Sequence, residues 1–180
     1  MFRKKNILYL FLSLVIGFAA LYIISPFLAV IYAVLWFDKI ILGIGPVHTF
    51  GIELTTIATV LLGIIFGPVI AFIFTIVFIP FFYTLKYMLL PLPQPEWPFF
   101  VPSPYNLVEA IGAATAGVLA QQSPLIVFVG VWIIKEITYV IVDKFTGKPP
   151  DIVYPVFNAI FNAVMIVYFG SFFLGLVGLG

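Results

Sequence analysis

The sequence predicts an all-helical, multi-pass membrane protein that forms a single transmembrane domain over residues 1–180. Hydrophobic residues make up 64% of the chain and charged residues only 8%, whereas soluble domains carry about 25% charged residues. Apolar stretches of about 20 residues recur between prolines, glycines and isolated charges, and in lipid only helices or closed barrels satisfy the backbone of such stretches. Both observations predict a bundle of helices embedded in a lipid bilayer.

The first helix is predicted over Ile7–Ser25, directly after the cationic run at positions 3–5. Its apolar stretch is too long for a signal peptide, and no clear A-x-A cleavage site follows it. Cationic residues favour the inner side of a membrane, so we expect a cytoplasmic amino terminus and a cell-membrane location. Pro26 then opens a long apolar connection, in which a short or re-entrant helix over Phe27–Phe37 is an open alternative to a loop.

The segment Ile52–Leu85 is apolar nearly throughout, yet it is too long to cross a membrane once. As one helix it would measure about 50 Å, against a hydrocarbon core of about 30 Å. Glycine ends helices readily, and proline is tolerated at the first helical position. Gly67-Pro68 therefore predicts a tight reversal between helices over Ile52–Phe66 and Pro68–Met88, with a proline kink in one tilted helix as the alternative.

Three further helices are predicted after a proline-rich loop over Pro91–Pro104, which cannot be helical. With six crossings and a cytoplasmic amino terminus, the three long connections face the exterior. The remaining helices are expected over Tyr105–Ala120, Pro124–Asp143 and Asp151–Phe173, separated by a short turn at 121–123 and a polar loop at 144–150.

Ionisable and amide side chains in the predicted helices are few and lie at one depth, near the three long connections. Each ionised group costs about 2.5 to 3.5 kcal/mol at the centre of a membrane helix, so a function is expected for them. Residues three or four apart share a helix face, and these faces can line one small-molecule cavity. The predicted solute-binding residues are Glu109, Lys135, Glu136, Asn158, Asn162, Trp132, Tyr139 and Tyr154, with Trp36, His48, Trp97 and Tyr105 as lids.

A purely structural role is the alternative for the same polar side chains. Lys135 can pair with Glu109 or Glu136 to hold helices together, and Asn158 and Asn162 can hydrogen-bond between helices. In that case the polar groups would fill the bundle and leave no cavity.

A stripe of small residues runs along the first helix at Ser13, Gly17 and Ala20. Small residues at this spacing allow a second helix to approach closely. The stripe predicts a contact either with a partner membrane subunit or with another helix of the same chain.

Several function classes have no support in the sequence. The chain has no cysteine and one histidine, so thiolate and multi-histidine metal sites are excluded. No metalloprotease, phosphate-loop or serine-hydrolase motif is present. The net charge of +1 gives no sign of a nucleic-acid surface. We therefore expect a protein that is not an enzyme and has no catalytic residue, metal or cofactor.

Three features resemble the substrate-binding S components of energy-coupling-factor transporters. They are the segment ELTTIATVLLGIIFGPVIAFIFTIVF with its Gly-Pro turn at 53–78, the small-residue stripe of the first helix, and NLVEAIGAATAGVLA at 106–120 followed by VFNAIFNAV at 156–164. The resemblance implies a six-helix subunit that binds a vitamin-like solute from outside and releases it inward. It also implies a transmembrane coupling subunit, which would meet the small-residue stripe, and ATPase subunits. The rival interpretations are a non-catalytic membrane scaffold, such as an MreD-like cell-shape protein, and a small lipid-modifying enzyme.

Overall fold

The computed structural model describes residues 4–44, 51–93, 95–149 and 153–176, and within these ranges every regular element is a helix. Four of the helical segments, 4–24, 26–44, 55–89 and 124–146, are long and apolar enough to cross a membrane. The chain is therefore all-helical and fits a multi-pass membrane protein. The helices are α1 (Lys4–Ile24), α2 (Pro26–Trp36), α3 (Thr55–Leu89), α4 (Pro104–Val118), α5 (Pro124–Thr146) and α6 (Val153–Leu176).

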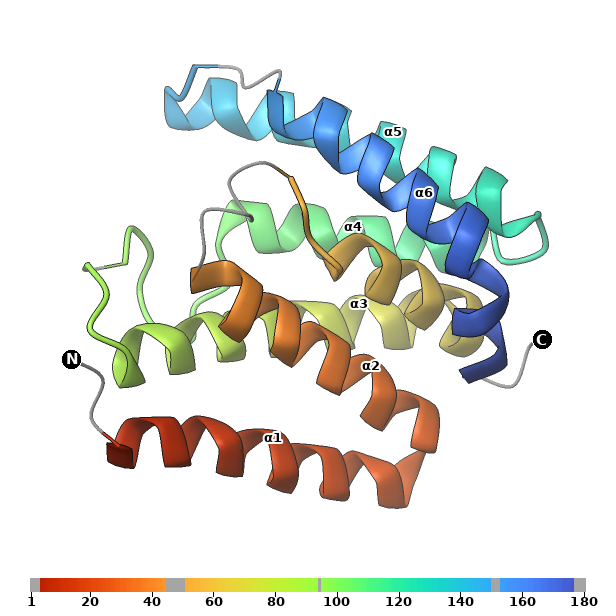
Figure 1. Cartoon of the computed structure of the whole chain (residues 1–180). Coiled ribbons are helices and arrows are strands. Elements are labelled where there is room, and N and C mark those ends of the chain that lie inside the picture. Colours follow the sequence, from red (N-terminus) through yellow and green to blue (C-terminus); the bar gives the residue numbers. More distant parts are fainter. Residues whose placement is uncertain (1–3, 45–50, 94, 150–152, 177–180) are drawn as a thin grey trace.

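The apolar connection after the first helix is itself a helix. Pro26 occupies the first helical position of α2, where its missing N–H is harmless. A π-helical turn, η1 (Phe37–Ile41), and a 3₁₀ turn, η2 (Leu42–Ile44), continue it, so helical structure extends over 19 residues, enough to cross a membrane. In Figure 1 this segment runs back alongside α1 in the opposite direction.

This return brings the amino-terminal end of α1 to the same end of the bundle as the long connections (Figure 1). The Asn6 amide donates a hydrogen bond to the backbone oxygen of Leu89, at the last turn of α3. The expectation that the amino terminus lies opposite the three long connections is therefore wrong. The six predicted crossings do not include the segment after Pro26, for which a loop and a short helix were both open, and one additional crossing reverses every later helix.

The predicted reversal at Gly67-Pro68 is confirmed. Gly67 has φ 77° and ψ 175° within the 55–89 segment, a backbone conformation that side chains with a Cβ rarely adopt. Thr55 and Lys86, near the two ends of α3, both bond to the 38–43 segment, to the Asp38 carboxylate and the Gly43 carbonyl respectively. The two halves of α3 therefore run antiparallel, as Figure 1 shows.

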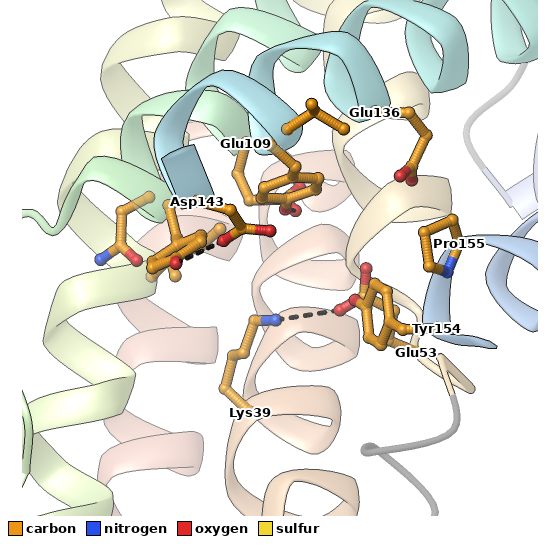
Figure 2. A pocket seen from close by; sticks show the side chains of 12 residues that line it. Lys39, Glu53, Glu109, Glu136, Asp143, Tyr154 and Pro155 are labelled. Carbon is orange, nitrogen blue, oxygen red and sulfur yellow. Dashed lines mark hydrogen bonds and ion pairs between the residues drawn. The ribbon is translucent and has the colours of Figure 1, made fainter. Parts of the chain in front are cut away.

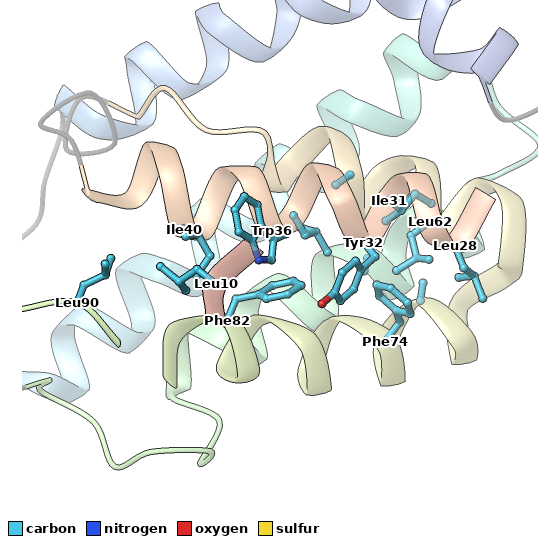
Figure 3. Close-up of a cluster of buried hydrophobic side chains, with 14 residues drawn as sticks. Leu10, Leu28, Ile31, Tyr32, Trp36, Ile40, Leu62, Phe74, Phe82 and Leu90 are labelled. Carbon is cyan, nitrogen blue, oxygen red and sulfur yellow. The ribbon is translucent and has the colours of Figure 1, made fainter. Parts of the chain in front are cut away.

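The apolar core lies between α2 and both halves of α3 (Figure 3). Tyr32 is 1% exposed and meets Phe78 and Phe82 edge to face, with ring centroids 5.4 and 5.0 Å away. Such pairs add about 0.5–1.5 kcal/mol beyond the burial of their area. This aromatic cluster fastens α2 to the second half of α3.

The small-residue stripe of α1 faces α2 within the chain. The Tyr32 hydroxyl donates to the backbone oxygen of Ser13 at 2.8 Å, and Trp36 Nε1 donates to Ser13 Oγ at 3.1 Å. A Cβ at Gly17 would overlap the ring of Tyr32. Ser13, Gly17 and Ala20 also line an apolar groove against α3. The expected contact with another helix is thus made by α2, while a partner subunit on this stripe stays a prediction.

Candidate functional site

A cavity of about 300 Å³ lies at the end of the bundle that carries the long connections. Residues from η1, the segment before α3, the second half of α3, and α4, α5 and α6 surround it (Figure 2). Its walls combine charged, tyrosine and aliphatic side chains, the composition typical of a small-molecule site. The lining residues are Lys39, Glu53, Ile79, Tyr105, Asn106, Glu109, Glu136, Tyr139, Val140, Asp143, Tyr154 and Pro155.

The π-helical turn η1 supplies the first two charged groups. Asp38 is fully buried and accepts hydrogen bonds from the backbone N–H of Leu54 and from Thr55 Oγ1, both at 2.6 Å. The next residue, Lys39, has its Nζ 3.2 Å from Asp38 Oδ2 and 3.5 Å from Glu53 Oε2. Short π-helical turns within longer helices are frequently found at functional sites. Here the turn presents two consecutive charged side chains to the start of α3.

Lys135 of α5 is the deepest cation of the site and is 2% exposed. Its Nζ lies 2.8 Å from Glu109 Oε2 and 3.9 Å from Glu53 Oε1, and it donates to Thr56 Oγ1 at 2.7 Å. A buried charge is tolerated when it has partners of opposite charge and further hydrogen bonds, and Lys135 has both. This lysine links α3, α4 and α5 behind the cavity wall.

Two tyrosines join the carboxylates of the wall. The Tyr139 hydroxyl donates to Glu109 Oε1, and the Tyr105 hydroxyl donates to Asp143 Oδ1 at 2.7 Å. The centroids of the two rings are 6.0 Å apart. These bonds run between α4 and α5, so they fix the width of the cavity at this side.

Asn158 of α6 holds the segment that precedes α3. Asn158 Nδ2 donates to the Gly51 backbone oxygen at 3.1 Å and to Glu53 Oε1 at 3.2 Å, and Asn162 Nδ2 donates to the Asn158 backbone oxygen at 2.9 Å. Gly51 has φ 76°, and a Cβ there would lie 2.5 Å from the Tyr154 backbone oxygen. Only glycine permits this approach, which orients Glu53 toward the cavity.

Glu136 differs from the other carboxylates of the wall. It is partly exposed on α5 and lines the cavity. In the described part of the chain no hydrogen bond or ion pair reaches its carboxylate. Figure 2 shows it across the cavity from Lys39. Its carboxylate is therefore available to a bound molecule.

Half of the predicted solute-binding residues line the cavity: Glu109, Glu136, Tyr139 and Tyr154. Lys135, Asn158 and Asn162 lie buried and do not line the cavity. Lys135 and Asn158 bond to other helices or to the segment before α3, as the structural alternative expects, whereas Asn162 donates only to the Asn158 backbone oxygen within α6. Trp132 is not among the lining residues, and its indole N–H has no partner among the described residues.

The expected lids have different positions. Tyr105 lines the cavity, whereas Trp36 is buried in the apolar core against α1. Trp97 lines a second, smaller cavity of about 220 Å³ together with Lys148. His48 lies outside the described residues.

Sequence reasoning did not name Lys39, Glu53, Asn106 or Asp143 among the solute-binding residues, although all four line the cavity. Adjacent charges at Asp38 and Lys39 follow an apolar run that begins at Phe27. Charges at the end of a membrane-length apolar segment are costly, so this pair was the sequence feature that could have indicated a functional role for Lys39. It was overlooked because the segment was expected to be a connection.

The fold and the site together define a class: an all-helical protein with the composition of a multi-pass membrane protein and a polar cavity at one end of its helices. No known protein family matches the chain, and neither a curated protein nor a solved structure is significantly similar to it. Functional inference therefore depends on the geometry of the cavity.

Proposed function

We propose that the protein is a membrane-embedded, solute-binding subunit of an uptake transporter for a vitamin-like small solute, similar to an S component of an energy-coupling-factor transporter. The observation that carries the proposal is the cavity of about 300 Å³ lined by charged and tyrosine side chains. That volume is at the lower end of the range for small-molecule sites. Charged side chains at this depth are costly, and a polar ligand gives a reason to keep them.

Transport would require further subunits. The sequence contains no phosphate-binding loop, so energy would come from separate ATPase subunits through a transmembrane coupling subunit. The small-residue stripe of α1 at Ser13, Gly17 and Ala20 is the proposed contact for the coupling subunit, on the side that α2 leaves open as an apolar groove.

We place the amino terminus and the cavity on the cytoplasmic side. The described lysines at helix ends near the cavity, Lys4, Lys5, Lys86 and Lys144, all belong to one end of the bundle, and cationic residues favour the cytoplasmic side. The cavity then opens on the side where an uptake subunit releases its solute. Capture from the exterior would require a second conformation.

A membrane scaffold is the second candidate, and the bonds that Lys135 and Asn158 make to other parts of the chain favour it. In a scaffold these bonds would only join helices, and the cavity would bind nothing. The two candidates therefore differ in whether the cavity holds a solute.

Retention of small molecules separates the two candidates. The full chain, purified in detergent, would be denatured and the released compounds identified by mass spectrometry. Val140→Trp fills the cavity mouth, since Val140 lines the cavity and is 57% exposed. Ile137→Trp is the matched control, because Ile137 is 58% exposed on the same helix and does not line the cavity. A solute retained by the wild type and by Ile137→Trp but lost in Val140→Trp supports the transporter subunit. Equal content in all three proteins supports the scaffold.

A further inference from the structure

We infer that the cavity binds a small organic cation, with a protonated or quaternary nitrogen next to an apolar or aromatic part. This inference rests on the proposed function, because it names the ligand class of the same cavity. It depends on the balance of charges around the cavity, on one carboxylate without a partner, and on the tyrosine rings of the wall.

Carboxylates outnumber ammonium groups at the cavity. Two lysines, Lys39 in the wall and Lys135 behind it, face five carboxyl groups. In a low-dielectric environment an excess of like charge is unfavourable unless a counter-charge is supplied. A positively charged ligand supplies it, whereas an anion would add to the excess. The five carboxyl groups are those of Asp38, Glu53, Glu109, Glu136 and Asp143.

One carboxylate remains for the ligand. The other four accept hydrogen bonds or form ion pairs within the protein. Glu136 has neither in the described ranges, and it lines the cavity from α5. An ammonium group at this carboxylate would form a charge-assisted hydrogen bond, which is about twice as strong as a neutral one.

Tyrosine rings supply the second part of the expected ligand contact. Tyr105, Tyr139 and Tyr154 line the same cavity as Glu136. The face of an aromatic ring attracts cations, and two of these rings already lie near protein ammonium groups, Lys135 Nζ at 5.9 Å from Tyr139 and Lys148 Nζ at 5.1 Å from Tyr105. A wall of this kind favours an organic cation with an apolar body.

A metal ion fits the cavity less well than an organic cation does. Among the described residues no three Asp, Glu or His side chains come close enough together to hold a metal ion. The carboxylates are instead distributed around a space of about 300 Å³. A ligand with several heavy atoms fills this space, and its charge can be met by Glu136.

Three probes of nearly equal shape test the inference: 2-phenylethylamine, 2-phenylethanol and 3-phenylpropanoate, which carry a positive, no and a negative charge. Isothermal titration of the full chain in detergent at neutral pH measures each affinity. We expect the amine to bind roughly ten-fold or more tightly than the alcohol, since hydrogen bonds to charged groups contribute about 1.5–3 kcal/mol. We expect the acid to bind most weakly.

Glu136→Gln removes the charge and keeps the shape of the side chain. It should weaken binding of the amine roughly ten-fold or more and leave the affinity for the alcohol unchanged. Glu96→Gln is the matched control, because the Glu96 side chain is 82% exposed and lies outside this cavity. If Glu136→Gln does not fold, the comparison of the three probes on the wild type still decides the ligand class.

The outcomes separate this inference from the proposed function. Equal binding of all three probes, or tightest binding of the acid, overturns the cationic ligand and leaves a solute-binding cavity. No binding by any probe, with no solute retained in the purified protein, overturns both. Amine binding that Glu136→Gln does not change overturns the role of Glu136.

Discussion

Charged side chains gather at one end of the helical bundle and are absent from the turns at the other end, although the same helices form both ends. At the end with the long connections, ion pairs join η1 to the segment before α3 and α4 to α5 around a cavity. At the other end the chain turns at Ser25, Gly67-Pro68 and residues 119–123, and none of these turns carries a charged residue. There, small residues allow the backbones to touch. A Cβ at Gly117 would lie 2.6 Å from the carbonyl carbon of Gly67.

The end with the long connections, here called the polar end, and the end with the short turns, here called the charge-free end, are therefore expected to have different roles. Close packing at the charge-free end needs no ligand and holds α3 to α4, whereas polar groups at the other end are costly unless they are paired or bound. Stability is expected to depend on both ends, and binding on the polar end alone.

The chain contains no native cysteine, so a single introduced cysteine can be labelled without background. Because the two ends lie on opposite sides of the membrane, a membrane-impermeant label should reach only one of them in intact cells. Lys144→Cys places a thiol at the polar end and Gln122→Cys at the charge-free end, and both positions are exposed. With a cytoplasmic polar end, a membrane-impermeant maleimide should label Gln122→Cys in intact cells and Lys144→Cys only after permeabilisation. The reverse pattern would place the amino terminus and the cavity outside.

Lys135→Met should cause the largest loss of stability. It leaves the Glu109 carboxylate without its buried counter-charge, while Glu53 keeps Lys39, and we expect the free energy of unfolding in detergent to fall by roughly 3–5 kcal/mol. Lys144→Met, an exposed position on the same helix, is the control. The double variant Lys135→Met/Glu109→Gln should recover part of the loss, since it removes the uncompensated charge. If Lys135→Met unfolds like the control, the ion pairs at the polar end do not hold the helices together.

Gly117→Ala tests the charge-free end. The added Cβ would collide with backbone atoms at the Gly67-Pro68 turn, which cannot move as a side chain can. We expect a loss of roughly 1–3 kcal/mol in thermal or chemical unfolding, with binding by any surviving folded protein unchanged. At Gly175 of α6 a new Cβ meets nothing within 4 Å, so Gly175→Ala should be neutral or slightly stabilising. Equal stability of the two variants would contradict the close approach of α4 to this turn.

The smallest effect is expected at the rim of the polar end. Lys148 Nζ lies 2.9 Å from Glu96 Oε2, but the two side chains are 45% and 82% exposed. The hydrogen bond to Glu96 raises the pKa of Lys148, so the ammonium stays charged at neutral pH. Exposed pairs contribute about 0–1 kcal/mol, and Lys148→Ala should change the unfolding free energy by no more than that. A loss comparable to that of Lys135→Met would show that the rim is part of the buried network.

The helices were largely predictable because their signals are local. Pro124 opens α5 at the first helical position, as predicted, and Gly67-Pro68 marks the reversal within α3. The role of the segment after Pro26 was not predictable with the same rules. Its apolar run is short, and the charges Asp38 and Lys39 interrupt it, so length alone did not distinguish a loop from a helix that continues through a π-helical turn.

The sequence predicted which types of residue form the candidate site, but only half of the solute-binding residues that it indicated line the cavity. Helical spacing placed Glu109 and Tyr139 correctly in the cavity wall, because residues on one helix face can be read from the sequence. Whether Lys135 or Glu136 faces the cavity depends on how α5 is rotated against α4, which is set by packing between helices. The sequence offers no measure of that rotation.

The sequence by itself determined that this chain is helical, suited to a membrane and poor in charged residues. Unpaired polar groups are costly in lipid, so few other backbone structures are possible there. Only the tertiary structure decided which carboxylates pair with lysines, that Glu136 has no such partner among the described residues, and that the amino-terminal end of α1 lies at the same end as the cavity. These properties depend on distances between residues far apart in the chain, which are fixed when the helices pack against one another.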